Sequence, residues 1–318
     1  MRFGLTTALP RTGEQARAFA RRVEDSGIDV LTFADHLAPF VAPFTAAAAA
    51  AAVTTRLHVG TLVLNNDFRH PVETARETAC LATLSDGRFE LGLGAGHMKS
   101  EYDAAGIPFE RGGTRVSRLV ESVTVVRALL AGESVDFDGA HYRVHAQAGE
   151  IVAVPDRRVP ILIGGNGTRV LQLAGRVADI VGFAGITHNH DATKVRLSHF
   201  DGPGLADRIA VVREAAGDRF GDIELNALVQ AVVVTDDTPR AAADLAEAFD
   251  ADPDALLSSP FLLIGNHEQM AEQLAACHEQ FGISYWTVFD ELPGRASALP
   301  DIAEVISLLR LVLQWRTV

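Results

Sequence analysis

Residues 57–96 read LHVGTLVLNNDFRHPVETARETACLATLSDGRFELGLGAG and contain one complete unit of the fold. An apolar run over 57–64 is followed by a segment of helical length over 71–84, which opens with a proline, a residue that suits the first helical turn. The Ser-Asp-Gly at 85–87 predicts a turn, and the apolar run at 88–93 predicts a second strand. A strand, a helix and a strand in this order predict two parallel neighbours in one sheet.

The same alternation recurs along the whole chain. Apolar runs that predict strands lie at 2–9, 30–34, 57–64, 88–93, 159–163, 180–183, 225–234 and 284–289. Helices are expected over 13–26, in the alanine-rich 45–52, and over 71–84, 113–131, 168–176, 205–216, 239–250, 267–280 and 300–315. Eight βα units in series predict an α/β protein built as a closed (β/α)8 TIM barrel.

Two stretches interrupt this rhythm. Within 133–159 the segment VDFDGAHYRVH alternates with period two around an Asp-Gly pair, which predicts a β-hairpin. The second interruption spans about 251–266. We therefore predict a single domain over 1–318, with insertions after the fourth and the seventh unit.

Composition and charge exclude several classes of partner. Lys and Arg total 28 against 41 acidic residues, a net charge of −13, which argues against binding to nucleic acid or to an anionic membrane. Cys80 and Cys277 lie far apart and belong to no Cys/His cluster, so we expect neither a disulfide nor a zinc site, as in a reducing cytosol. We see no signal peptide or membrane span, and expect a cytoplasmic protein without a metal.

The chemistry of such a barrel lies where its strands end. The second strand ends in Asp35-His36, and two titratable groups after an apolar run are costly to bury unless paired or functional. A histidine there can move a proton near neutral pH, and an adjacent carboxylate can fix its tautomer. The alternative is a helix cap by Asp35 beside a satisfied histidine.

Two glycine-rich loops follow the fourth and fifth strands. Gly94-Ala95-Gly96-His97 allows close approach of a planar ring or a phosphate, but its spacing is not that of a dinucleotide fingerprint. Gly164-Gly165-Asn166-Gly167-Thr168 runs straight into a helix, where free N–H groups favour an anion. Taken from the residues alone, each loop is either a cofactor cradle or a structural turn.

Several motifs together resemble the bacterial luciferase-like family, in particular its coenzyme F420-dependent oxidoreductase branch. They cover nearly the whole chain and occur in the family's order: Asp35-His36, GTLVLNN, LSDGRFELGLGAG, EYDAAGIPF, RLVESVTVVRALLAGESVDFDGAHYRV, PILIGGNG and FLLIGNHEQMAEQL. The resemblance implies a TIM barrel that holds a deazaflavin at its mouth and commonly forms a homodimer.

The resemblance also implies roles for individual residues. The ring lies against a bulge on the third strand with a non-prolyl cis peptide, which by position falls at Leu62–Val63. His36 is then the proton carrier and Asp35 either orients it or contacts the ring, while His97 is a second proton donor or a pocket wall. The residues expected to contact the cofactor are Asp35, Leu62, Val63, Asn65, Gly94, Ala95, Gly96, His97, Tyr102, Gly164, Gly165, Asn166, Gly167 and Thr168.

This resemblance implies an F420-dependent dehydrogenase or reductase that acts on a small organic molecule. Because Lys99 and Lys194 are the only lysines, glucose 6-phosphate, the substrate of some family members, is not expected here. Three alternatives stay open: an FMN-dependent luciferase-like monooxygenase, a non-catalytic flavin-binding barrel, and a metal-dependent barrel hydrolase.

Overall fold

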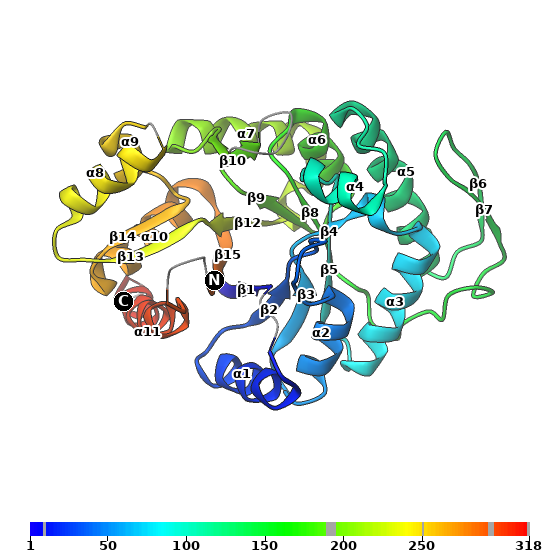
Figure 1. The fold of residues 1–318 in the computed structure, drawn as a ribbon, viewed down its shortest axis with the longest axis horizontal. Helices are drawn as coiled ribbons and strands as arrows, with labels where there is room; N and C mark the ends of the chain where they lie inside the picture. Colours follow the sequence, from blue (N-terminus) through cyan, green and yellow to red (C-terminus); the bar gives the residue numbers. More distant parts are fainter. Residues whose placement is uncertain (9–10, 189–194, 250, 292–295, 317–318) are drawn as a thin grey trace.

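The computed structural model describes residues 1–8, 11–188, 195–249, 251–291 and 296–316, and its centre is a closed barrel of eight parallel strands (Figure 1). The strand order β3-β2-β1-β15-β12-β9-β8-β5 closes on itself because β3 also pairs with β5. The barrel strands are β1 (Arg2–Thr7), β2 (Val30–Phe33), β3 (His58–Thr61), β5 (Phe89–Gly94), β8 (Ile161–Gly164), β9 (Ile180–Phe183), β12 (Glu224–Val229) and β15 (Ile283–Phe289). The predicted TIM barrel is confirmed.

A ring of helices surrounds these strands (Figure 1). It consists of α1 (Gly13–Asp25), α2 (Pro43–Ala51), α3 (Pro71–Leu84), α5 (Gly112–Leu130), α6 (Thr168–Val177), α7 (Gly202–Ala216), α10 (His267–Phe281) and α11 (Leu299–Arg316). Local signals fix several of the starts: Thr12 caps α1 with a capping box, and Pro71 opens α3. No helix among the described residues is both long and apolar enough to cross a membrane.

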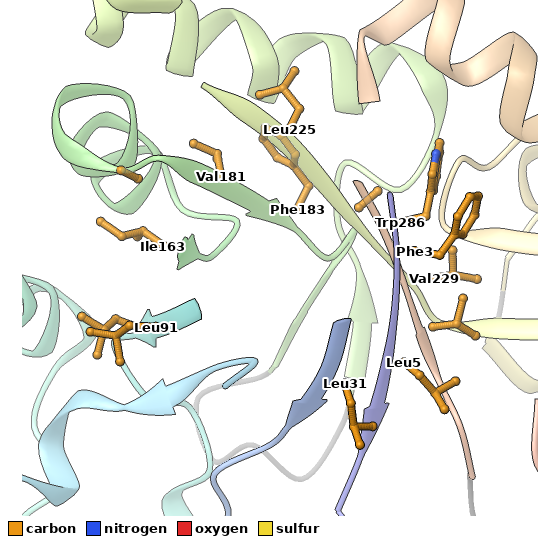
Figure 2. Close-up of a cluster of buried hydrophobic side chains, with 14 of the residues drawn as sticks. Phe3, Leu5, Leu31, Leu91, Ile163, Val181, Phe183, Leu225, Val229 and Trp286 are labelled. Atoms are coloured by element: carbon orange, nitrogen blue, oxygen red, sulfur yellow. The ribbon is translucent and has the colours of Figure 1, made fainter. Parts of the chain in front are cut away.

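The strands carry two separate sets of buried side chains. One set, which includes Phe3, Leu91, Phe183 and Trp286, packs outward against the helices (Figure 2). A smaller apolar cluster lies in the barrel interior, and it comprises Val30, Leu162, Ile180 and Tyr285. This two-sided burial is why barrel strands appear in the sequence as continuous apolar runs.

The amino-terminal end of the barrel is filled by charged side chains. Arg2 forms ion pairs of 2.5 Å with both Glu90 and Glu224, and its guanidinium lies 4.4 Å from the centre of the Tyr285 ring. His58 lies 3.4 Å from the same Glu90. Arg2, Glu90 and Glu224 pair with one another at this end, whereas the residues singled out from the sequence lie at the carboxyl ends of the strands, which form the mouth of the barrel.

The structure departs from the sequence prediction at the seventh strand. The predicted strand over 225–234 breaks at Gln230, whose backbone N–H donates to Phe261 O at 2.8 Å. Beyond this break β13 (Ala231–Val234) leaves the barrel and pairs with β14 (Leu262–Gly265), so predicting one continuous strand was wrong. The helices α8 (Thr238–Phe249) and α9 (Pro253–Leu257) lie between β13 and β14 in the chain.

Other short elements decorate the mouth and the outer surface. A hairpin of β6 (Val135–Asp138) and β7 (Arg143–Ala146) projects beyond α5 (Figure 1). The remaining elements are β4 (Leu64–Asn65), the 3-10 turns η1 (Asn66–Phe68) and η2 (Gly217–Asp222), α4 (Lys99–Ala105), β10 (Ile186–His188) and β11 (Val195–Leu197). Of these, α4 was not predicted, and it contributes to the site. That 1–318 forms a single domain stays a prediction.

Candidate active site

The carboxyl ends of three neighbouring strands meet around a small cavity at the mouth of the barrel. Its volume is about 40 Å³, and it is lined by Asp35, His36, Val63, Leu64, Asn65, Gly96, His97, Met98 and Glu101. A larger cavity of about 590 Å³ lies between β13, α8 and the start of α11 and holds none of the predicted site residues. A cavity of this size has room for water or for a small substrate group.

His36 is held at the edge of this cavity by a carboxylate from outside the barrel. Its Nδ1 lies 2.7 Å from Glu101 Oε1, on the short helix α4. The His36 ring stands edge-on to Phe40 and to His97, with centroid distances of 6.2 and 5.5 Å. The sequence prediction missed Glu101, although it opens the EYDAAGIPF segment that contributed to the resemblance.

Asp35 has a different set of partners. Arg69 binds both of its oxygens, with Nη1–Oδ2 at 2.5 Å and Nη2–Oδ1 at 3.2 Å, and the backbone N–H of Asn65 donates to Oδ2 at 3.0 Å. These bonds satisfy a carboxylate that is almost fully buried. The expectation that Asp35 orients the His36 imidazole is therefore corrected, because Glu101 holds the ring instead.

The third strand carries the irregular backbone expected from the resemblance. The peptide bond between Leu62 and Val63 is cis, which confirms the prediction at that position. The side chain of Val63 then lies over glycines of the two following strands. A Cβ on Gly94 would come within 2.6 Å of Val63 Cγ2, and one on Gly164 within 3.1 Å of Val63 Cγ1.

The same strand explains Gly92, where a Cβ would lie 2.0 Å from the carbonyl oxygen of Thr61. The Thr61 hydroxyl also exchanges hydrogen bonds with the backbone of Gly92, at 2.9 Å in both directions. Glycine at alternate positions of β5 therefore leaves the space that Thr61 and Val63 of the third strand occupy. Gly94 and Gly164 are thus packing positions in this structure, which the glycine pattern alone did not reveal.

Gly96 is required by the buried Tyr102. Its φ is +74°, and a Cβ there would lie 2.2 Å from the Tyr102 hydroxyl oxygen. That hydroxyl lies 2.9 Å from Asn65 Oδ1 and 3.0 Å from Asp67 Oδ2, and the residue has no exposed surface. Burial, together with the nearby Asp67 carboxylate, raises the pKa of Tyr102. The Tyr102 side chain therefore supports the loops of the mouth, and its contact with a cofactor stays a prediction.

The loop after β8 leads into α6 without a side-chain cap among the described residues. Gly167 is the cap residue, and no described atom lies within 4 Å of the place where its Cβ would be. Asn166 is used elsewhere, since its Nδ2 donates to Ser198 O at 2.9 Å. Gly165 is packed against Val170. The free donors at this end are thus the first backbone N–H groups of α6.

A cation accompanies these free N–H groups. Arg208 Nη1 donates to Thr168 Oγ1 at 3.2 Å, and its Nε is buried without a hydrogen-bond partner among the described residues. A helix amino terminus with a nearby guanidinium is suited to an anionic group. By contrast, no group of three or more His, Cys, Asp or Glu side chains in the described part of the chain could hold a metal ion.

Comparison with known proteins places this geometry in context. Residues 1–284 match the sequence model of a family described as luciferase-like monooxygenase. The chain is 34% identical over 188 residues to an F420-dependent glucose-6-phosphate dehydrogenase of Microbacterium testaceum, covering 56% of this chain and 55% of that one. It is 39% identical over 168 residues to the enzyme of the same name from Mycobacterium avium, covering 49% and 48%. The chain thus spans about half the length of these relatives.

Solved structures with the same fold include enzymes of several names. The coenzyme F420-dependent tetrahydromethanopterin reductase of Methanopyrus kandleri matches with a TM-score of 0.73 and 17% identity, over 96% of each chain. An F420-dependent secondary alcohol dehydrogenase matches with 0.73 and 20%, over 97% of this chain and 99% of that one. A long-chain alkane monooxygenase matches with 0.74 and 16%, over 100% and 92%. At these identities the likeness shows the fold alone.

Proposed function

The chain belongs to the luciferase-like monooxygenase family, and from this premise we propose that it is a coenzyme F420-dependent oxidoreductase. The observation that carries the proposal is the imidazole of His36, held by Glu101 at the edge of the mouth cavity. A barrel that only stored a flavin would need no such proton-transfer group. The two relatives named as F420-dependent dehydrogenases, at 34% and 39% identity, support the deazaflavin over FMN.

The residues at the mouth suit an anionic, planar cofactor. The uncapped amino terminus of α6 and the guanidinium of Arg208 provide donors for its phosphate, with Gly167 and Thr168 contributing backbone N–H groups. The bulge at Leu62–Val63 and the loop Gly94–His97 lie at neighbouring strand ends and would contact its ring system. The bound deazaflavin would supply the hydride acceptor or donor.

The chain's own residues would then handle the proton and exclude water. Nδ1 of His36 is bonded to Glu101, so Nε2 is the atom that would take up or deliver the proton that accompanies hydride transfer. Asp35, neutralised by Arg69, fixes the backbone of Asn65 and gives shape to the pocket. We assign His97, edge-on to His36, as the second polar group that faces the substrate.

The substrate we propose is a small, uncharged organic molecule and not a sugar phosphate. Glucose 6-phosphate is named for the relatives, but Lys99 of this chain is paired with Asp103 at 2.5 Å. Lys194, the second lysine, lies outside the described residues. Beside His36 the exposed side chains are apolar, with Leu37 47% and Phe40 38% exposed.

Anaerobic turnover with F420 across a panel of alcohols and carbonyl compounds, with glucose 6-phosphate included, tests this proposal. We expect turnover of an uncharged substrate, its loss by roughly 10²-fold or more in His36→Asn, and F420 binding that is unchanged in that variant. Arg208→Ala should weaken F420 binding and leave the fold intact. Unchanged turnover in His36→Asn would overturn the role of this residue.

Assembly and location rest on the sequence. We propose a homodimer, which light scattering on the purified chain tests. A cytoplasmic location likewise stays a prediction.

A further inference from the structure

The contact between His36 and Glu101 bears on which nitrogen of the His36 ring carries a proton. The carboxylate lies on α4, 65 residues further along the chain, and its side chain is 9% exposed. A carboxylate oxygen is a hydrogen-bond acceptor, so the donor that complements Glu101 across the 2.7 Å contact is an N–H at Nδ1 of the histidine. In a neutral imidazole this leaves Nε2 without a proton.

Asp35, the other carboxylate that lines the cavity, does not hold the His36 ring. Both oxygens of Asp35 are bound by Arg69, and one of them also accepts the N–H of Asn65. The two acidic side chains therefore have separate partners, one a cation and one an imidazole. His97 meets the His36 ring edge-on, with an angle of 87° between the planes.

We propose that Glu101 is a positioning residue that fixes His36 in the Nδ1–H tautomer and thereby makes Nε2 a proton acceptor. The inference rests on the proposed function for its meaning, because the proton in question is the one that accompanies hydride transfer. An alcohol substrate would give its O–H proton to Nε2 while its C–H hydride reduces the deazaflavin by two electrons and the C=O bond forms. The carboxylate also stabilises the imidazolium produced.

The tautomer can be measured without cofactor or substrate. Two-bond ¹H–¹⁵N correlation spectra of the purified chain, labelled with ¹⁵N-histidine, distinguish Nδ1–H from Nε2–H rings, and the signal missing in His36→Asn identifies His36. We expect the Nδ1–H pattern in the wild type. We expect Glu101→Gln to lose it, because the carboxamide can donate to Nδ1. An Nε2–H pattern for wild-type His36 would overturn the proposal.

Asp103→Asn is the matched control, because it makes the same chemical change on the same helix at an exposed side chain that pairs with Lys99. The His36 spectrum should not change in this variant. If Glu101→Gln does not fold, the spectra of the wild type and of Glu101→Asp still test the tautomer of His36. The shorter carboxylate of Glu101→Asp should keep part of the Nδ1–H pattern. A Nδ1–H ring in a chain that fails to bind F420 would refute the proposed function and leave the role of Glu101 standing.

Kinetics give a second readout. Glu101→Gln should lower kcat for alcohol oxidation by roughly 10²-fold with little change in KM, as expected for a general base in the wrong tautomer. An equal loss in Asp103→Asn would contradict a specific effect of Glu101.

Discussion

Arg69 closes a bidentate ion pair on Asp35 at the rim of the barrel, with Nη1–Oδ2 at 2.5 Å and Nη2–Oδ1 at 3.2 Å. The carboxylate is 4% exposed and the guanidinium 24% exposed. The pair joins the end of β2 to the segment that leads into α3, and the Asn65 N–H held by Asp35 extends it to the third strand. It thus fixes two strand ends of the mouth.

Removing Arg69 should leave a buried carboxylate without its cation. We expect Arg69→Ala to lower the free energy of unfolding by about 3 kcal/mol, less than for a fully buried pair because the guanidinium is partly exposed. Arg69→Lys should lower the free energy of unfolding by less, since lysine keeps the charge but not the bidentate contact. Urea unfolding measures both variants, and the double variant with Asp35→Asn should recover part of the loss. A change below about 0.5 kcal/mol in Arg69→Ala would contradict the account.

Gly92 should not tolerate a side chain. A Cβ there would lie 2.0 Å from the Thr61 carbonyl oxygen, a backbone atom fixed by the sheet. We expect Gly92→Ala to cost about 3 kcal/mol or to prevent folding, at the upper end of the range for overpacking. The control is Gly221→Ala, because no described atom lies within 4 Å of that Cβ. Equal thermal stability of the two variants would show that the third strand can move away from Gly92.

Tyr102 distinguishes support of the site from direct contact with the cofactor. The fully buried hydroxyl bonds to Asn65 and Asp67, so Tyr102→Phe should destabilise the fold by about 1–2 kcal/mol and leave the Kd for F420 unchanged. Unfolding and equilibrium titration on the same preparation measure the two effects. A raised Kd at unchanged stability would restore the direct contact that the sequence suggested.

Glu121 should make the stability of the chain depend on pH. Burial acts to raise the pKa of Glu121, but hydrogen bonds from the backbone N–H groups of His141, Ala140 and Tyr142, at 2.9 to 3.1 Å, outweigh it and lower that pKa. A carboxyl with a lowered folded-state pKa stabilises the fold above its unfolded-state value of about 4.3, and loses that effect as the pH falls through the folded-state pKa.

The difference in Tm between the wild type and Glu121→Gln should therefore be full at neutral pH and shrink as the pH falls below about 4. The wild type should be the more stable protein at pH 7, because the carboxamide accepts the same N–H groups less strongly. A difference that is the same at all pH values would contradict the account.

Much of the fold follows from local pattern, and the failures have a common cause. The barrel strands are buried on both faces and rich in apolar residues, so their alternation with helices was visible in the sequence. The break at Gln230 was not, because the partner of its N–H, Phe261, lies 31 residues away. A strand break that depends on such a distant contact is not visible in the local hydrophobic pattern of the sequence.

The site shows the same division. The positions of Asp35, His36 and the glycine loops at strand ends followed from the barrel rule. Their partners did not, because Glu101 and Arg69 reach the mouth from α4 and from the segment before α3. Adjacent residues in a chain suggested a pair of Asp35 with His36, whereas the fold gives each its own partner. The glycines of β5 were open to two interpretations until Val63 and Thr61 were seen to occupy the space beside them.

The central claim is that this barrel binds a deazaflavin in preference to a flavin. Equilibrium titration of the purified, cofactor-free chain with F420 and with FMN, at the same ionic strength, tests it most directly. The account predicts tighter binding of F420, and a loss of that binding in Arg208→Ala. Tighter binding of FMN than of F420 would contradict it.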